Sequence, residues 1–379
     1  MHILIAPNAF KHSLTATETA DAIEEGLKRS GLDFTSECFP IADGGDGTGH
    51  LIVEKCVGVW HEYEVQDPLG RLIKASLGIT DQGKTAVIEM ADASGIRLLN
   101  PEERLPLLAS SLGTGQLIRF AIDRQVEKII IGLGGSATVD GGIGILSALG
   151  MKFRDADGLE LAALPQNMPS FRQIDSSAFD ERVLKCQITV LCDVDNLLLG
   201  EQGSAAVFGP QKGASKADVE FLDHALTNLS DLAFKTNGIK MNEIIHGGAA
   251  GGIAAALFTF LNARLVNGAE YFLELTAFEK RLKNADLLIT GEGCLDEQTL
   301  QGKGPFAVAK LAKECNITVI GIAGSVPLNE NPDLNRYFDI VMPIGNQPTD
   351  LQTAMNFTTS NLIRTASVIG KFLSLPKTI

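Results

Sequence analysis

Residues 129–142 read Ile-Ile-Ile-Gly-Leu-Gly-Gly-Ser-Ala-Thr-Val-Asp-Gly-Gly, and this stretch decides the fold class. Its apolar run predicts a buried strand, and its glycines predict a loop leading into a small-residue helix that ends at Gly150. Backbone amides at the start of such a helix bind phosphate or carboxylate, helped by the helix dipole. Ser136, Thr138 and Asp140 add polar groups to the loop. We therefore predict an α/β protein whose glycine loop binds an anion or a nucleotide, with a tight structural turn as the alternative.

The same loop leaves the identity of the nucleotide open. Residues 132–137 match the looser G-x-G-x-x-A pattern of dinucleotide-binding loops. An enzyme that uses NAD(P) requires an acidic residue about 20 positions further on to bind the ribose. Asp155 and Asp157 fall in that range but also fit a hairpin turn. If the nucleotide is ATP, we predict that Gly134 and Gly135 bind it, so an NAD(P)-dependent oxidoreductase of a small hydroxy acid is an alternative to a kinase.

Both ends of the chain alternate short apolar runs with helical patterns. At the N-terminal end, residues 3–6 predict a strand, and Thr15 with Glu18 predicts a helix that begins with a capping box. At the C-terminal end, Thr276 and Glu279 predict another capping box. Further elements are predicted there, namely strands at 286–290, 317–323 and 338–343 and a closing helix at 349–373. This alternation is typical of a doubly wound parallel sheet.

The length of 379 residues exceeds the usual size of one hydrophobic core, so we expect two domains. The middle of the chain reads differently from its ends, because it contains turn-rich stretches such as 66–71 and a long amphipathic helix opened by Ser215. We predict one α/β domain built from residues 1–58 and 285–379, with a second α/β domain, residues 59–284, inserted into it. A cleft between two domains is a preferred place for a ligand.

Composition narrows the classes of partner. The net charge of −14, from 46 acidic and 32 basic residues, argues against nucleic acid, whose phosphates attract a basic surface. The most apolar stretch, residues 247–261, is too short to span a bilayer, so we expect no membrane association. Six cysteines without a CxxC pair predict reduced thiols, and the N-terminus reads as a strand rather than a signal peptide. We therefore predict a cytoplasmic protein, and we leave a homodimer open.

Carboxylates and cations gather in loops. Phosphoryl transfer requires Mg²⁺ ligands, positive charge on the phosphates and a base near the acceptor hydroxyl. The acidic loops follow predicted strands, where ligands collect in doubly wound sheets, and they hold Asp43 and Asp46, Asp193 and Asp195, and Glu292 and Asp296. The cations in glycine or turn contexts are Lys11, Arg71, Arg97, Lys212 and Lys303. The sequence contains neither a P-loop nor the protein-kinase motifs, so a kinase with this sequence lies outside the P-loop and protein-kinase superfamilies. It also lacks the G-x-S-x-G elbow of serine hydrolases.

Taken together, the loops resemble the bacterial glycerate kinase family of the 2-phosphoglycerate-forming type. The resemblance rests on motifs in the same order along the chain, at residues 6–15, 42–48, 89–95, 113–115, 132–142, 192–196, 206–213, 248–252 and 290–300. It implies transfer of the γ-phosphoryl group of ATP to D-glycerate, with Mg²⁺. It also implies a flavodoxin-like doubly wound domain made from the two chain ends, with an inserted mixed α/β domain.

On this interpretation, the substrate lies in the interdomain cleft. Its carboxylate would be bound by the amides of the glycine loop with Ser136, and by Arg71 or Lys212. The acceptor hydroxyl would be oriented and deprotonated by Asp193 or Asp195. These residues are the predicted substrate-binding and catalytic groups of that half of the reaction.

The predicted groups around ATP come from other loops. Lys11 or Lys303 would neutralise the phosphates, and Lys11 is also a predicted catalytic residue. Glu292 and Lys303 would bind the nucleotide together with the two loop glycines. The predicted Mg²⁺ ligands are Asp43, Asp46 and Asp296.

The first loop and three later positions depart from the usual pattern of the family. The loop has Asn8, Ala9 and His12 where the family usually has Asp, Ser and Gly. Val139 stands where the family commonly has Asn, Cys294 where it commonly has Arg, and Glu297 where it commonly has Gly. One acid and one cation are therefore replaced. A non-catalytic sensor of sugar acids on the same fold is the remaining alternative, and the retained Asp-rich loops argue against it.

Overall fold

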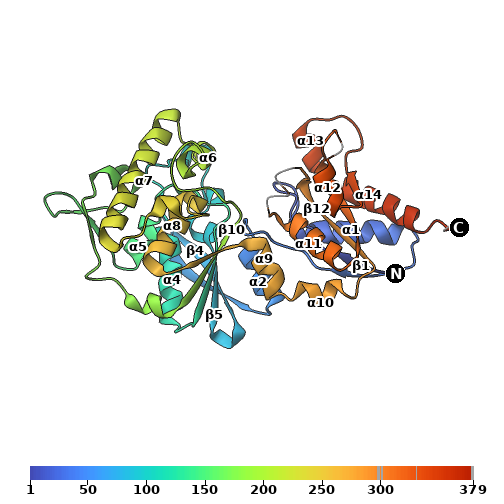
Figure 1. Ribbon diagram of the computed structural model, residues 1–379, viewed down its shortest axis with the longest axis horizontal. Coiled ribbons are helices and arrows are strands. Elements are labelled where there is room, and N and C mark those ends of the chain that lie inside the picture. Colours follow the sequence, from blue (N-terminus) through green and yellow to red (C-terminus); the bar gives the residue numbers. More distant parts are fainter. Residues whose placement is uncertain (297–298, 300–301, 330, 377–379) are drawn as a thin grey trace. The chain divides into compact units, whose positions relative to one another are not determined.

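The computed structural model describes residues 1–296, 299, 302–329 and 331–376 (Figure 1). Contacts group the chain into unit 1, residues 1–43 with 269–379, and unit 2, residues 44–268. The boundaries predicted from the sequence, at 58/59 and 284/285, fall inside unit 2 and unit 1 respectively.

Packing explains the shifted boundaries. Helix α2 (Thr48–Lys55) packs on β4 and β5, so it groups with unit 2. At the other boundary, Phe272 of α9 (Gly268–Leu275) and Phe278 of α10 (Phe278–Leu282) pack with tilted rings against Phe39, so these helices group with unit 1.

Unit 1 contains a five-stranded sheet in the order β14-β13-β12-β1-β2, with every pair parallel. Its strands are β1 (His2–Ile5), β2 (Thr35–Cys38), β12 (Leu287–Cys294), β13 (Thr318–Ser325) and β14 (Ile340–Pro343). Counted along this unit, the spatial order is 2-1-3-4-5, the flavodoxin-like arrangement. The predicted doubly wound sheet made from both chain ends is confirmed.

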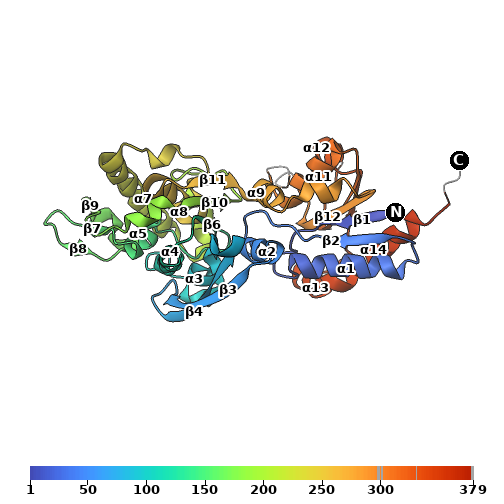
Figure 2. The ribbon, with the colours of Figure 1, turned by 90° about the horizontal axis from the view of Figure 1, so that it is seen from below.

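Helices cover both faces of this sheet. Figure 2 shows α1 (Ala16–Arg29) and α14 (Thr358–Leu373) on one face and α11 (Gly304–Glu314) on the other. Helices α1 and α14 approach closely at Gly26, where an added Cβ would lie 2.3 Å from the carbonyl oxygen of Ile363. The remaining helices of this unit are α12 (Pro332–Tyr337) and α13 (Leu351–Asn356).

Two local predictions for this unit are wrong. The single helix expected at 349–373 is two helices, α13 and α14, which meet at Phe357. The capping box expected at Thr276 does not form, because its hydroxyl donates to the carbonyl of Phe272 in the preceding helix. The box at Thr15 and Glu18 is confirmed.

Unit 2 contains a mixed six-stranded sheet in the order β11-β10-β6-β5-β4-β3. Its strands are β3 (Val59–Gln66), β4 (Leu72–Thr80), β5 (Thr85–Glu89), β6 (Lys128–Gly132), β10 (Gln187–Cys192) and β11 (Arg264–Asn267). Strands β5, β6, β10 and β11 are parallel, whereas β3 and β4 pair antiparallel at one edge. The mixed α/β character expected of the inserted segment is therefore confirmed.

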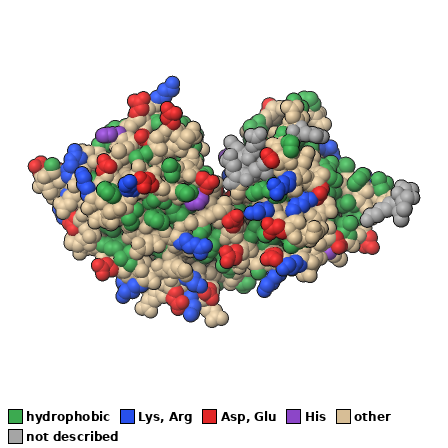
Figure 3. All heavy atoms as spheres, viewed as in Figure 1, with side chains coloured by type: hydrophobic (Ala, Val, Ile, Leu, Met, Phe, Trp, Pro, Cys, Tyr) green, Lys and Arg blue, Asp and Glu red, His purple; other side chains and the backbone are tan. Residues whose placement is uncertain are grey.

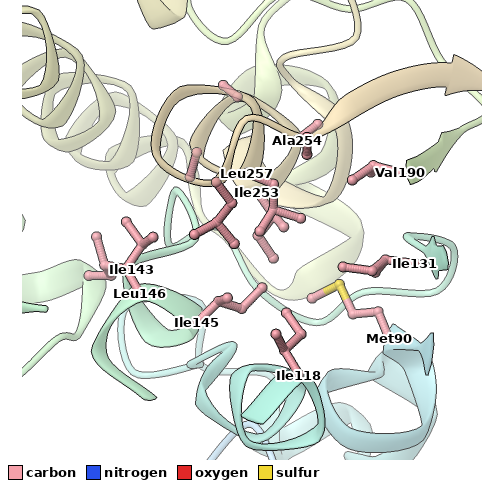
Figure 4. Packing of buried hydrophobic residues seen from close by; sticks show 14 of the residues in the cluster. Met90, Ile118, Ile131, Ile143, Ile145, Leu146, Val190, Ile253, Ala254 and Leu257 are labelled. Atoms are coloured by element: carbon pink, nitrogen blue, oxygen red, sulfur yellow. The ribbon is translucent and has the colours of Figure 1, made fainter. Parts of the chain in front are cut away.

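Alternate residues of the strands face opposite sides of this sheet. Ile131 and Val190 face a core that also contains residues of α4 (Leu112–Asp123), α5 (Ile143–Ala148) and α8 (Ala249–Leu261) (Figure 4). On the other face, Val87 lies close to Gly49 of α2, because a Cβ added at Gly49 would lie 3.5 Å from Cγ1 of Val87. Burial on both faces explains why the run at 129–131 is apolar throughout.

A small antiparallel sheet and several shorter elements complete unit 2. The small sheet comprises β7 (Lys152–Arg154), β8 (Glu160–Leu161) and β9 (Gln173–Asp175). The other helices are α3 (Met90–Ser94), α6 (Ser204–Phe208) and α7 (Lys216–Asn237), and Ser215 caps α7 as predicted. The 3₁₀ turns are η1 (Asp81–Gly83), η2 (Ile96–Leu98), η3 (Pro101–Glu103), η4 (Pro165–Ser170), η5 (Glu181–Lys185), η6 (Pro210–Lys212) and η7 (Met241–Glu243).

The surface carries charge of both signs. Figure 3 shows acidic and basic side chains interspersed over the face in view. Within the described part of the chain, no helix is both long enough and apolar enough to cross a membrane.

Candidate functional site

The predicted site residues fall into two groups, one in each unit, and each group is described by itself. In unit 2, Lys212 is the last residue of η6, and only 3% of its surface is exposed. Its Nζ donates to Ser136 Oγ and to the carbonyl oxygen of Thr138, both at 2.8 Å. Burial lowers the pKa of Lys212 to about 7, while the charges of Asp140 and Asp193 act in the opposite direction. The predicted residues Lys212, Ser136 and Asp193 are thus brought together.

Asp140 fixes the glycine loop at the start of α5. Its carboxylate accepts from the amide and the hydroxyl of Ser111, at 2.8 and 2.7 Å. It also accepts from the amides of Gly142 and Gly144, at 3.0 and 3.3 Å. Burial raises the pKa of Asp140, and these hydrogen bonds oppose that rise. Asp140 therefore holds the loop that presents Ser136.

The predicted nucleotide residues Gly134 and Gly135 lie against the loop at 44–47. A Cβ at Gly134 would lie 2.1 Å from the amide nitrogen of Asp46, so only glycine permits this approach. Gly135 has φ 69°, and a Cβ there would lie 3.1 Å from Asp46 Oδ2. Asp46 accepts from Arg97 at 2.9 Å, and Arg97 also donates to Asp92. Asp46, a predicted Mg²⁺ ligand, is thus ion-paired.

Asp193 and Asp195 follow β10 but differ in surroundings. Asp193 lies close enough to Lys212 for its charge to raise the pKa of that amine. Asp195 is 74% exposed and lies 3.0 Å from Nδ1 of His246. The same Nδ1 lies 2.8 Å from the carbonyl oxygen of Val194, so the ring carries a proton there and donates it. His246 is not among the predicted site residues, although it directly precedes the glycines of 247–248.

Arg71 holds the turn between β3 and β4. Its guanidinium donates to Asp67 at 2.5 Å and to Glu103 at 2.6 Å, and these hydrogen bonds raise the pKa of Arg71. The carbonyl of Leu98 accepts a further bond at 3.3 Å. Of the two predicted cations for the substrate carboxylate, only Lys212 lies beside Ser136.

In unit 1, the second group lies where β1 and β12 end. These neighbouring strands connect to opposite sides of the sheet, which makes their carboxyl ends the topological switch point where ligands bind in doubly wound sheets. Asn8 follows β1 and donates from Nδ2 to Asp43 Oδ2 at 2.8 Å, in a buried contact. The amide of Asn8 donates to the carbonyl of Gly291 at 2.8 Å, which ties this loop to β12.

Glu292, near the end of β12, lies at the centre of this group. It is 6% exposed, and its Oε1 accepts from the hydroxyl of Thr299 at 3.0 Å. Burial raises the pKa of Glu292 to about 7, assisted by the charge of Asp43 and opposed by Lys303 and Lys11. The structure therefore gathers two carboxylates and two lysines at the switch point.

Asp296 stabilises the turn after β12. Its Oδ1 accepts from the amide of Thr299 at 3.3 Å, and its Oδ2 lies 3.3 Å from Cys294 Sγ. Part of the 290–300 motif lies outside the described residues, namely positions 297, 298 and 300, as does position 301 after it. Lys303 is the residue before α11, whose first turn contains Pro305.

Among the described residues, no group of three or more His, Cys, Asp or Glu side chains is arranged to hold a metal ion.

Asp155, which an NAD(P) enzyme would use to bind the ribose, lies in the turn between β7 and β8. Its carboxylate accepts hydrogen bonds from the amides of Asp157 and Leu159, both at 2.9 Å. Asp155 therefore stabilises a hairpin turn, as the alternative prediction expected.

Comparisons with known proteins agree along the length of the chain. The sequence model of the "Glycerate kinase family" matches residues 3–374. Glycerate kinase of Bacillus subtilis (strain 168) is 42% identical over 381 residues, covering 100% of this chain and 99% of that protein. Glycerate 2-kinase of Escherichia coli (strain K12) is 40% identical over 379 residues, covering 99% and 98%. The crystal structure of putative glycerate kinase 2 from Salmonella typhimurium LT2 superimposes with a TM-score of 0.82, at 43% identity and 98% coverage of both chains.

Proposed function

The chain belongs to the glycerate kinase family, and from this premise we propose that it transfers the γ-phosphoryl group of ATP to D-glycerate and forms 2-phosphoglycerate. The observation that carries this proposal is the group of Lys11, Lys303, Asp43 and Glu292 at the switch point of unit 1. The two lysines can bind the phosphates of ATP, and the two carboxylates can bind the metal ion that accompanies them.

The carboxylates fit Mg²⁺ by their donor chemistry. Magnesium in kinases is held by one or two carboxylates and completes its shell with phosphate oxygens and water. Asp43 and Glu292 supply two such carboxylates, and Glu292 must be ionised to serve. When bound, the ion neutralises charge on the phosphates. Asp46 and Asp296 stay predictions as ligands, because one is paired with Arg97 and the other holds the turn at Thr299.

Unit 2 supplies the groups for the acceptor. Lys212 is a buried amine that points at the glycine loop, so its protonated form binds the carboxylate of glycerate there with Ser136. Asp193, next to this amine, orients the acceptor hydroxyl and takes its proton. We favour Asp193 over Asp195, since Asp195 is exposed and engaged with His246.

The reaction follows from these roles. As the hydroxyl proton passes to Asp193, the hydroxyl oxygen forms a bond to the γ-phosphorus, and the bond from that phosphorus to the β-phosphate oxygen breaks to release ADP. Lys11 and Lys303 stabilise charge on the transferred and leaving phosphates. Donor and acceptor must meet for this step, so the interdomain site predicted from the sequence remains part of the proposal.

The choice of the 2-hydroxyl rests on a relative. The Escherichia coli protein is named glycerate 2-kinase and is 40% identical to this chain. The cytoplasmic location and a homodimer remain predictions from the sequence.

Phosphorus NMR tests the proposal directly. The protein is incubated with D-glycerate, ATP and Mg²⁺, and we expect the signals of ADP and 2-phosphoglycerate, with no product when Mg²⁺ is replaced by a chelator. A 3-phosphoglycerate signal would overturn the regiochemistry alone. The absence of any phosphoglycerate, together with fluorescence changes on addition of a nicotinamide nucleotide, would favour the oxidoreductase instead.

A further inference from the structure

Glu89, the last residue of β5, contains an unusual buried carboxyl group. Its side chain is 0% exposed, and its Oε2 accepts from the amide of Gly49 at 2.7 Å. Its Oε1 has no hydrogen-bond partner among the residues that the structure describes. A buried polar atom without a partner is costly, so its presence in a native fold calls for an explanation.

Two glycines make room for this carboxyl. Glu89 is the register partner of Gly132 on the neighbouring strand β6. A Cβ at Gly132 would lie 3.5 Å from both carboxyl oxygens, and one at Gly49 would lie 3.0 Å from Oε2. The carboxyl is therefore enclosed between the first turn of α2 and the start of the glycine loop.

The two segments that Glu89 touches also contact each other. Gly134 of the glycine loop approaches the amide of Asp46, which lies just before α2, so closely that a Cβ would stand 2.1 Å away. The glycine loop presents Ser136 to Lys212. A shift of α2 at Gly49 would therefore be transmitted to the residues that face the substrate.

We infer that Glu89 is a positioning residue, whose carboxyl holds the first turn of α2 against the glycine loop and so keeps Ser136 and Lys212 in place for phosphoryl transfer. The kinetic part of this inference rests on the function proposed above. Glu89 is not a catalytic residue, because it acts on the substrate only through the two loops.

The surroundings of Glu89 favour a neutral carboxyl group. Burial raises the pKa of Glu89 well above its ordinary value, and the charges of Asp46 and Asp92 add to this, against the Gly49 hydrogen bond and the charge of Arg97. The charged groups that act on it are Asp46 before α2, Asp92 on α3 and Arg97 on η2, and the titratable His50 on α2 contacts Asp92. Burying an ionised carboxylate without a counter-charge is costly, whereas the neutral acid avoids that cost.

Substitution of Glu89 by Gln tests whether the side chain acts through its hydrogen bond to Gly49 or through a negative charge. The amide of Glu89→Gln has the shape of the neutral acid and its oxygen can accept from Gly49, so we expect kcat/KM for glycerate at neutral pH to stay close to that of the wild type. Glu89→Ala loses the contact, and we expect kcat/KM to fall about 100-fold, as misplacement of reacting groups by roughly 1 Å does. Glu64→Gln, on the exposed side of β3, is the matched control and should leave kinetics unchanged.

The pH dependence gives a second readout. Measured as kcat at saturating D-glycerate, where the rise in KM expected from Lys212 has no effect, the wild type should lose activity on the alkaline side as Glu89 ionises. Glu89→Gln should lack that loss in kcat. A folded Glu89→Gln protein as inactive as Glu89→Ala would overturn the inference, as would an identical alkaline loss in Glu89→Gln and the wild type. Failure of Glu89→Gln to fold would also contradict it, because an amide should replace a neutral acid.

Thermal unfolding tests the same carboxyl without relying on activity. A carboxyl whose pKa is raised in the folded state stabilises the fold most below its ordinary pKa of 4.5, and this stability is lost as the pH rises toward the folded pKa. The Tm of Glu89→Gln relative to the wild type should therefore increase with pH, and a constant difference would contradict the neutral carboxyl. A wild type without kinase activity would overturn the proposed function, and these unfolding data would still decide the charge state of Glu89.

Discussion

The amine of Lys212 lies 2.8 Å from the hydroxyl oxygen of Ser136, a residue 76 positions earlier in the chain. This contact joins η6 to the glycine loop after β6 and places a buried amine beside Ser136 and the carbonyl oxygen of Thr138. Asp193, the proposed proton acceptor, lies close enough for its charge to raise the pKa of that amine. The substrate half of the proposed reaction depends on this relationship.

Lys212→Met should remove the cation and retain the apolar stem. We expect kcat/KM for D-glycerate to fall about 10- to 100-fold, because a hydrogen bond to a charged group contributes roughly 1.5–3 kcal/mol. The KM for ATP should change little. Lys216→Met, at the exposed start of α7, is the control, and equal losses in both variants would contradict a specific role for Lys212.

The affinity for glycerate should depend on pH. Because burial lowers the pKa of Lys212 to about 7, the cation is present below that pH and is lost above it. We expect the KM for D-glycerate to rise as the pH increases through this value, and Lys212→Arg, which stays charged, should lack the rise. A KM for the wild type that is the same on both sides of that pH would show that Lys212 does not bind the carboxylate.

Asp193→Asn should abolish proton transfer to this side chain. We expect kcat to fall about 100-fold or more, the range typical of a lost general base. Asp195→Asn is a matched neighbour and should retain most of the activity, since Asp195 is exposed and contacts His246. Steady-state kinetics at saturating ATP and glycerate measure both variants. The reverse ranking would transfer the role of base to Asp195.

Glu292→Gln should weaken the use of Mg²⁺. We expect the Mg²⁺ concentration that gives half-maximal activity to rise about tenfold, because one of the two proposed carboxylate ligands becomes a neutral amide. Rates are measured against free Mg²⁺ at fixed ATP. Glu314→Gln, exposed at the end of α11 in the same unit, should behave like the wild type. An unchanged Mg²⁺ dependence in Glu292→Gln would remove Glu292 from the proposed metal site.

Gly26→Ala should destabilise unit 1. The new methyl group would lie 2.3 Å from the carbonyl oxygen of Ile363, so α1 and α14 must separate. We expect a loss of about 1–3 kcal/mol, as for other overpacked sites. Gly345→Ala is the control, because a Cβ there meets no atom within 4 Å. Urea unfolding of both variants checks the prediction, and equal midpoints would contradict it.

Local patterns predicted much of the fold. The predicted capping box at Thr15 and the predicted helix start at Ser215 both form, because each depends on residues three positions apart. The apolar run at 129–131 is a buried strand for a similar reason, since its side chains alone specify burial on both faces. The box at Thr276 failed because the preceding helix supplied a competing acceptor at Phe272.

The candidate site was predictable only in part. The sequence by itself determined which loops carry carboxylates, lysines and glycines, because strand ends and turns are encoded by neighbouring residues. Only the tertiary structure decided that Lys212 meets Ser136, that Asp46 pairs with Arg97, and that Glu89 is enclosed by Gly49 and Gly132. These contacts join residues far apart in the chain. Their pairing, burial and shifted pKa values arise from the packing of whole elements, which no local pattern specifies.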